Sequence, residues 1–111
     1  MEDLLVATLQ LTGYSVGIYR LTSHQREEIR QFVDQNRVGE PTFTVSGFAS
    51  TSSNHELNLA LSTARAEAVA NFIVDLKIPN DKVITRSFGE RLFTGNDRKG
   101  QLSMAVLIEA L

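Results

Sequence analysis

The pattern of apolar and polar positions begins with two short runs that each suit a strand. Residues 4–11 alternate loosely, and residues 14–21 alternate again after a turn that contains Gly13. Two strand-like runs around a glycine-containing turn predict a β-hairpin. Leucines of the first run also fit helical spacing, so a short helix over residues 2–11 is the alternative.

The pattern then changes to helical spacing. Thr22 followed three residues later by Gln25 has the form of a capping box, in which each side chain bonds the other residue's backbone N–H. Apolar residues recur after it at positions i, i+3 and i+4, namely Ile29, Phe32 and Val33. The sequence therefore predicts a first helix that begins after Thr22 and is followed by a loop over residues 36–41, which contain a glycine and a proline.

A second helix is expected in the middle of the chain. Residues 49–54 are small and polar and predict a loop, and residues 55–60 predict a helical turn. Ser62 is a candidate N-cap for a long helix. Its predicted buried face consists of Leu61, Ala68, Val69, Phe72, Ile73 and Leu76. The helix should end before Pro79, because a proline disfavours helical geometry in the residue before it.

Three further runs predict strands. Residues 42–48 place Phe43 and Val45 inward, residues 83–88 form a third core strand, and residues 102–111 alternate as a final, largely covered strand. The order β-(β)-α-β-α-β-β predicts an α+β fold, a two-layer sandwich with a mixed sheet and two main helices on one face. A chain of 111 residues suits one domain, taken here as residues 1–111.

Composition excludes several function classes. A net charge of −2 gives no reason to expect nucleic acid as a partner. The absence of cysteine excludes a thiol nucleophile and a cysteine zinc site. No apolar run reaches the ~18 residues of a membrane-spanning helix. The first residues do not resemble a signal peptide, so the sequence fits either a cytoplasmic protein or part of an exported one.

Motifs for catalysis are also missing from the sequence. His24 and His55 are expected at the surface, and neither belongs to a G-x-S-x-G elbow or an H-E-x-x-H zinc motif. The basic turn over residues 95–100 is expected to be solvated rather than to hold phosphate. We therefore predict a domain that is not an enzyme and uses no cofactor or metal.

Arg65 is the candidate for ligand recognition. It falls early in the predicted second helix among Leu61, Ala68 and Val69. A guanidinium near a helix N-terminus could bind a carboxylate in a bidentate pair. The alternative is that Arg65 pairs with a local acid or extends over the edge of the sheet.

Several motifs occur together around this arginine. A strand ends in Gly47-Phe48, and the pattern N-x-x-L-S-x-x-R-A-x-x-V runs without a gap from Asn58 to Val69. Ile78-Pro79 and Phe88-Gly89-Glu90 follow at matching distances. Over residues 14–106 this combination resembles the OmpA/MotB-like C-terminal domain, the peptidoglycan-associated fold of bacterial envelopes.

The resemblance implies a site for the stem peptide of peptidoglycan. In that family a helix arginine holds a carboxylate, and an Asp after the second strand holds the ammonium of diaminopimelate. The arginine position falls on Arg65 and the Asp position on Ser50, with Asn58 and Ala49 completing the implied ligand-binding set. A lost charge-assisted contact costs ~1.5–3 kcal/mol, or roughly 10- to 100-fold in affinity.

Two hypotheses follow from the resemblance. The first is a periplasmic module, tethered to the outer or inner membrane in the full-length protein, that binds peptidoglycan or anchors an envelope complex at the cell wall. The second is a degenerate domain that serves as a structural part of a secretion or conjugation apparatus, with envelope proteins as partners. The apolar final strand, with Leu102, Met104, Val106 and Ile108, would then be adhesive if exposed and could support a homo-oligomer. A cytoplasmic domain that shares only the architecture is a third option.

Overall fold

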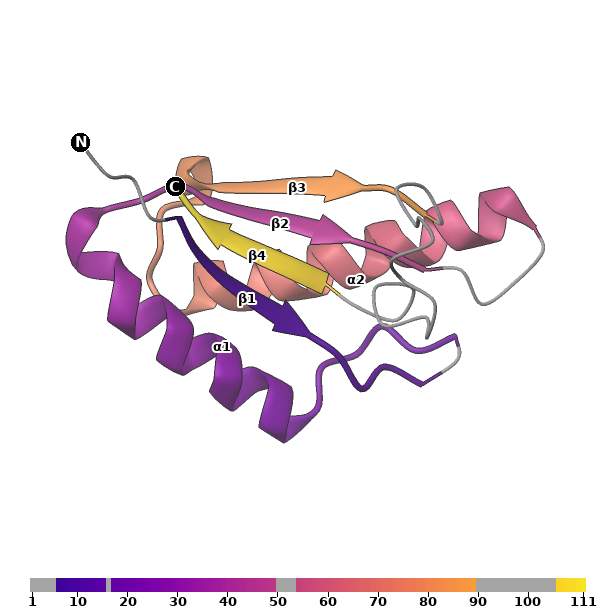
Figure 1. Cartoon of the computed structure of the whole chain (residues 1–111), viewed down its shortest axis with the longest axis horizontal. Coiled ribbons are helices and arrows are strands. Elements are labelled where there is room, and N and C mark those ends of the chain that lie inside the picture. Colours follow the sequence, from indigo (N-terminus) through magenta and orange to yellow (C-terminus); the bar gives the residue numbers. More distant parts are fainter. Residues whose placement is uncertain (1–5, 16, 50–53, 90–105) are drawn as a thin grey trace.

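The computed structural model describes residues 6–15, 17–49, 54–89 and 106–111 of the chain. Within these residues, four strands, two helices and two short 3₁₀ turns follow one another (Figure 1). In chain order they are β1 (Ala7–Leu11), α1 (Ser23–Asn36), η1 (Arg37–Gly39), β2 (Phe43–Gly47), α2 (His55–Asp75), η2 (Asn80–Lys82), β3 (Val83–Ser87) and β4 (Val106–Ala110).

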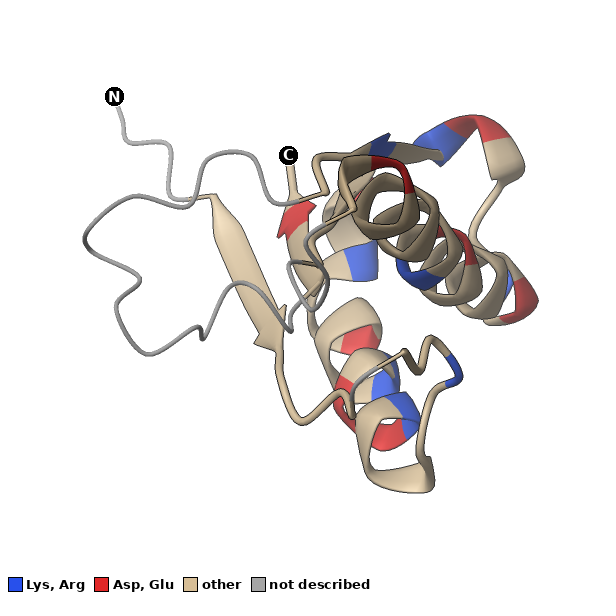
Figure 2. Cartoon of the chain, turned by 90° about the vertical axis from the view of Figure 1, so that its right-hand side faces the viewer, with Lys and Arg blue, Asp and Glu red and all other residues tan. Residues whose placement is uncertain are grey.

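The strands form one mixed sheet in the order β1-β4-β2-β3. β2 and β3 run parallel, whereas β4 is antiparallel to both of its neighbours. Figure 2 shows both helices on the same side of the strands, with acidic and basic residues interspersed along them. The predicted α+β fold, a two-layer sandwich with a mixed sheet and two helices on one face, is confirmed.

The predicted N-terminal hairpin is wrong in its second half. β1 exists, but it pairs with β4, in a register that places Leu11 opposite Val106. Among the described residues between 14 and 21, none belongs to a strand or helix. Over Ala7–Leu11 the alternative helix is not formed either. Tyr14 is buried in the core, but Ile18, which the alternation places on the same face, is 46 % exposed, so the pattern does not mark a buried strand face.

The first helix agrees with its prediction. Thr22 is the N-cap, its hydroxyl accepts from the backbone N–H of Gln25 at 3.0 Å, and the Gln25 side chain accepts from the N–H of Thr22 at 2.9 Å. Gln25 also donates to the carbonyl of Thr12 at 2.8 Å, which ties the helix start to the end of β1. Ile29 and Val33 are fully buried, as the apolar stripe predicts.

The second helix is longer than predicted. It begins at His55, with Asn54 as N-cap, and runs without interruption to Asp75. The Asn54 side chain accepts from the backbone N–H groups of Glu56 and Leu57 at 2.9 and 3.1 Å. Ser62 is therefore not a cap but a buried residue inside the helix. Asparagine is a strong N-cap residue, and several good helix formers lie between Asn54 and Ser62, so the helix begins at the earlier cap.

β4 is covered, as predicted for the final strand, whereas β3 is not the core strand that was expected. β3 is an edge strand whose middle residues are exposed, with Ile84 45 % exposed, so it is not a core strand. β4 lies between β1 and β2, and Val106 and Ile108 are fully buried. The prediction that the final strand is an adhesive edge for a homo-oligomer is therefore wrong within Val106–Ala110, because β4 is paired with a strand on each side. Leu102 and Met104, which belong to the same prediction, lie outside the described residues.

The hydrophobic core lies between the sheet and the two helices. It combines residues from every strand but β3 with residues of both helices and the connecting segments. Its buried members are Leu11, Tyr14, Ile29, Phe32, Val33, Phe43, Val45, Ala66, Val69, Ile73, Ile78, Val106 and Ile108. Within the described part of the chain, no helix has the length and apolar character needed to span a membrane.

Candidate functional site

The candidate site lies where β2 ends and passes over the middle of α2. Gly47 makes this approach possible, because a Cβ at that position would collide with the backbone carbonyl oxygen of Ser62. A glycine is therefore required by close approach of two backbones rather than by an unusual φ angle. The sequence pattern of Gly47 and the Leu61-Ser62 pair thus brings strand and helix into direct contact.

Two hydroxyl groups of α2 fasten the neighbouring loop to the helix. Ser62 Oγ donates to the carbonyl of Leu59 at 2.8 Å and accepts from the backbone N–H of Gly89 at 3.0 Å. Thr63 Oγ1 shares a 2.8 Å hydrogen bond with Ser87 Oγ at the end of β3. The ends of β2 and β3 are therefore held against the same turn of α2.

Arg65 is fully buried at this junction. Its Nε donates to the carbonyl of Ile18 at 2.8 Å, Nη1 to that of Phe48 at 3.0 Å, and Nη2 to that of Ser15 at 3.2 Å. Its guanidinium carbon lies 4.6 Å from the centre of the Tyr14 ring, a cation–π distance. One side chain thus joins α2 to the end of β2 and to the segment before α1.

Neither sequence-based alternative for Arg65 describes this arrangement. Its three hydrogen-bond acceptors are backbone carbonyls rather than an acidic side chain, and it does not extend over the sheet edge. Burial lowers the pKa of Arg65, and it raises the pKa of Tyr14, which the Arg65 charge opposes. A guanidinium stays protonated at neutral pH, so the site contains a buried charge that is stabilised by dipoles and a ring.

The helix N-terminus does not assist Arg65. α2 begins at His55, so Arg65 lies ten residues, about three turns, further along. The partial charge at a helix end acts within the first turn, so the argument that free N–H groups stand beside this arginine is wrong. The error follows from taking Ser62 as the cap.

The other predicted site residues are placed as follows. Asn58 is 2 % exposed in the first turns of α2, and Ala49 is fully buried just after β2. The backbone N–H of Ala49 already donates to the carbonyl of Gly89 at 2.9 Å, so in this arrangement it offers no hydrogen bond to a ligand. Ser50 lies outside the described residues.

Sequence reasoning missed the partners of Arg65. The carbonyls of Ser15 and Ile18 lie about 50 residues away in sequence, and backbone acceptors leave no signature in a residue pattern. Tyr14 lies in the run of residues 14–21 that predicts a strand, whereas in the structure its ring lies over the guanidinium. A tyrosine is a common partner of an arginine, but the sequence alone does not pair the two.

Groups that could support catalysis or hold a metal are not assembled in the described residues. Both histidines are exposed, as predicted, and His24 Nε2 lies 3.9 Å from the carboxylate of Glu28. Among the residues whose positions the structure gives, no three His, Cys, Asp or Glu side chains come close enough to hold a metal ion. The basic turn over residues 95–100 lies outside the described ranges.

Comparison with known proteins identifies the arrangement. Residues 14–102 match the sequence model of the OmpA family. Among solved structures, the OmpA-like domain of FopA1 from Francisella tularensis is similar at a TM-score of 0.77 and 23% identity, covering 95% of this chain and 71% of that one. The search of curated proteins finds no relative.

Two other solved structures are similar over most of their own lengths. The cell wall anchor of the type VI secretion system from Pseudomonas aeruginosa has a TM-score of 0.72 at 13% identity, covering 96% of this chain and 81% of that one. The peptidoglycan-associated lipoprotein from Burkholderia pseudomallei has a TM-score of 0.73 at 17% identity, covering 91% and 87%. At these identities the likeness concerns the fold.

Proposed function

The chain belongs to the OmpA family, and on that premise we propose that residues 1–111 form one domain that anchors an envelope protein at the bacterial cell wall. The family and the similar solved domains are of a binding and anchoring kind, so the domain is not an enzyme. The proposed ligand is the stem peptide of peptidoglycan. The proposed location is the periplasm, with a tether to the outer or inner membrane elsewhere in the full-length protein.

The observation that carries this proposal is the position of the Arg65 guanidinium. It is fixed at the junction of β2 and α2 by carbonyls from two separate segments. Three of its N–H groups are used there, out of the five that a guanidinium has. The remaining two are the ones that we assign to a carboxylate of the stem peptide.

We expect the binding to be weak. The Arg65 side chain is fully covered, so a ligand must displace part of the chain above it. By the resemblance, the family's Asp position falls on Ser50, and a serine supplies no charge for the ligand ammonium. Both features lower affinity relative to a site with an open arginine and an acid.

Cosedimentation with purified peptidoglycan sacculi tests the proposal. The wild-type chain should sediment with sacculi, and Ser50→Asp should strengthen binding by roughly 10- to 100-fold, because the acid restores a charge-assisted contact. Ser50→Asn is the matched control, since it has a similar size and no charge. Arg65→Ala is a poor first variant, because its loss would disturb the fold as well as the site.

A wild-type chain that stays in the supernatant would overturn cell-wall anchoring for this domain. The second candidate, a structural module of a secretion or conjugation apparatus with envelope proteins as partners, would then be favoured. Its supporting observation is the same arginine, which is buried and bonded to three backbone carbonyls of the protein. If Ser50→Asp and Ser50→Asn bind alike, Ser50 is not at the ligand ammonium.

A further inference from the structure

A short exposed segment between β1 and α1 lies against the Arg65 guanidinium. It consists of Ser15 and residues 17–20, called the strap below, and it belongs to the loop that leads from β1 to α1 in Figure 1. The chain is anchored on both sides of the strap. Tyr14 before it is buried in the core, and Thr22 after it is the N-cap of α1. The strap residues themselves are all exposed.

The strap is held to the rest of the described chain through Arg65. Nε of Arg65 donates to the carbonyl of Ile18 at 2.8 Å, and Nη2 donates to that of Ser15 at 3.2 Å. The backbone N–H of Ile18 also donates to the carbonyl of Ser15 at 3.1 Å, which closes a turn within the strap. This turn brings two carbonyl oxygens to the same guanidinium.

The two strap carbonyls occupy an edge of the guanidinium that a carboxylate can use. Nε and Nη2 lie along one side of the planar group, and their N–H groups form a fixed fork. A carboxylate binds such a fork with its two oxygens in a bidentate pair. The carbonyl oxygens of Ile18 and Ser15 stand in the place of those two oxygens. The strap and a ligand carboxylate therefore exclude one another at this edge.

Two further contacts of Arg65 do not involve the strap. Nη1 donates to the carbonyl of Phe48 at 3.0 Å, at the end of β2, and the guanidinium carbon lies 4.6 Å from the centre of the Tyr14 ring. Both contacts can persist when the strap moves away. An open strap would therefore leave a guanidinium that is already oriented and whose bidentate edge is free, so little ordering is left for the ligand to impose.

The strap has the features of a segment that opens locally. Its end does not pack tightly on α2, because Tyr19 and Arg20 line an open hollow of about 350 Å³ together with Ala68 and Phe72. Gly17 gives the open strap the largest backbone freedom that a residue can supply. Exposed segments with few buried apolar contacts open at a lower free energy than the whole domain unfolds.

We propose that the strap is a gate, which opens as a local unit and so exposes the bidentate edge of Arg65 to a carboxylate of the stem peptide. The inference rests on the proposed function for its ligand, and it identifies the part of the chain that must move and the bonds that are exchanged. The freed edge adds to the two N–H groups that we assign to the ligand. The affinity for peptidoglycan is then reduced in proportion to the fraction of molecules whose strap is open.

Chemical modification tests the gate without any cell-wall ligand. Phenylglyoxal reacts with guanidinium groups that solvent reaches, and peptide mass spectrometry gives the initial rate at each arginine. Arg65 should react, more slowly than the exposed Arg86. Its rate should stay nearly constant in urea below the unfolding transition, because a local opening exposes little surface. The amide exchange of Val69, which is buried in α2, reports unfolding of the whole domain in the same samples.

Two results of this measurement would overturn the gate. One is an Arg65 that does not react while the domain is folded. The other is an Arg65 rate that rises with urea in step with the exchange of the Val69 amide, because Arg65 would then become accessible only when the whole domain unfolds.

Gly17→Ala should shift the gate toward its open state. The closed strap has φ +73° at this position, where an alanine is strained and a glycine is not. The Arg65 modification rate and the affinity for sacculi should therefore both rise, by roughly 3- to 5-fold. Gly39→Ala is the matched control, since its Cβ also meets nothing within 4 Å and its φ is not positive. An Arg65 rate that responds no more to Gly17→Ala than to the control would refute the gate.

The two readouts separate the gate from the proposed function. If Gly17→Ala raises the Arg65 rate but wild type and variant bind sacculi equally, the strap does not control binding, and the inference is wrong while cell-wall anchoring stands. If the Arg65 rate rises and neither chain sediments with sacculi, the proposed function is wrong. The opening of the strap over Arg65 then stands, because phenylglyoxal reaches the guanidinium without peptidoglycan.

Discussion

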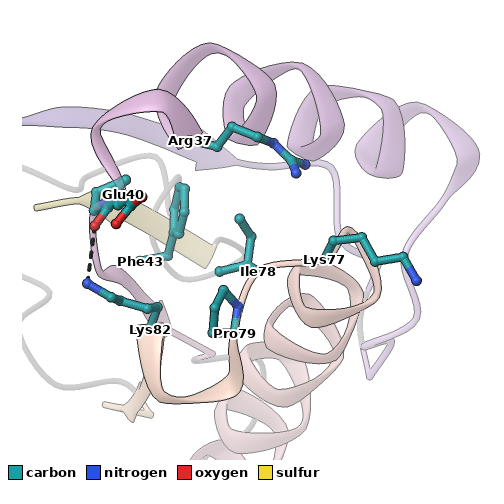
Figure 3. A pocket seen from close by; sticks show the side chains of 8 residues that line it. Arg37, Glu40, Phe43, Lys77, Ile78, Pro79 and Lys82 are labelled. Atoms are coloured by element: carbon teal, nitrogen blue, oxygen red, sulfur yellow. Dashed lines mark hydrogen bonds between the residues drawn. The ribbon is translucent and has the colours of Figure 1, made fainter.

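An arginine from another element lies near each end of β2, and the two differ in burial and in hydrogen bonding. At its C-terminal end Arg65 is fully buried and donates to three backbone carbonyls under the Tyr14 ring. At its N-terminal end Arg37 is partly exposed beside a cavity that Lys82 also lines (Figure 3), and it has a buried Nε without a partner in the described residues. The Arg65 guanidinium joins three backbone carbonyls of separate segments, whereas the Arg37 guanidinium is bonded to one carbonyl and one nearby carboxylate.

This difference shows that the chemical type of a residue does not by itself assign a function. Both are arginines near the end of the same strand, but the number of N–H groups already bonded decides what each can do. The family position of Arg65 supports a ligand role, and its contacts support a structural one.

Arg65→Ala should cause the largest loss of stability, ~3–5 kcal/mol. It removes the Arg65 donor from the carbonyls of Ile18 and Phe48, leaves the carbonyl of Ser15 with only its bond from the N–H of Ile18, and creates a cavity beside Tyr14. Urea unfolding followed by circular dichroism measures the change. Arg30→Ala is the control, since Arg30 is exposed and pairs with Glu27 at the surface, where the expected loss is below ~1 kcal/mol. A loss for Arg65→Ala no larger than that of the control would show that the buried contacts do not hold the fold.

Gly47→Ala should cost ~2–3 kcal/mol at the same end of β2. The added methyl group meets the carbonyl oxygen of Ser62, a backbone atom that cannot rotate away. Gly39→Ala at the other end is the matched control, because its Cβ would meet nothing within 4 Å and its φ is not positive. Thermal unfolding of both variants gives the comparison. Equal midpoints would mean that strand and helix can separate without cost.

Tyr14→Phe should change the pH dependence of stability rather than stability at pH 7. The Tyr14 hydroxyl is buried without a hydrogen-bond partner in the described part of the chain, so its removal is nearly neutral. Burial raises the pKa of Tyr14, so the folded state retains the proton where the unfolded state loses it. Wild-type stability should therefore fall by ~1.4 kcal/mol per pH unit above the ordinary tyrosine pKa of ~10.

Unfolding of wild type and Tyr14→Phe at pH 8, 9.5 and 11 measures this effect. The two chains should be equally stable at pH 8, and the variant should lose less at pH 11. If the free energies of unfolding of the two chains fall in parallel up to pH 11, Tyr14 is not a buried neutral tyrosine beside the Arg65 guanidinium.

The sequence predicted the elements that depend on local signals. The Thr22–Gln25 capping box, the stripe of Ile29 and Val33, and the inward Phe43 and Val45 all occur as expected, because each arises from spacing within a few residues. The motifs around Arg65 likewise identified the family. Local pattern and family spacing therefore established the fold class.

Contacts between segments that are distant in sequence could not be predicted from local patterns. β1 pairs with β4, almost 100 residues later, rather than with the next segment of the chain. The three acceptors of Arg65 are backbone atoms, which any residue type supplies. The cavity at Arg37 and Lys82 joins residues more than 40 positions apart, so neither residue stood out in the sequence. The predicted site could be named from a motif, but its burial and hydrogen bonding required the folded chain.

Lys77→Gly should have the smallest effect and the opposite sign, a gain of ~0.5–1 kcal/mol. Lys77 follows α2 with φ +76°, a conformation that costs a non-glycine residue ~1–2 kcal/mol and a glycine almost nothing. The greater flexibility of glycine in the unfolded chain offsets part of the gain. Urea unfolding of the variant and of the wild type, followed by circular dichroism, measures the difference. A less stable variant would show that Lys77 makes contacts that outweigh the strain of its left-handed backbone.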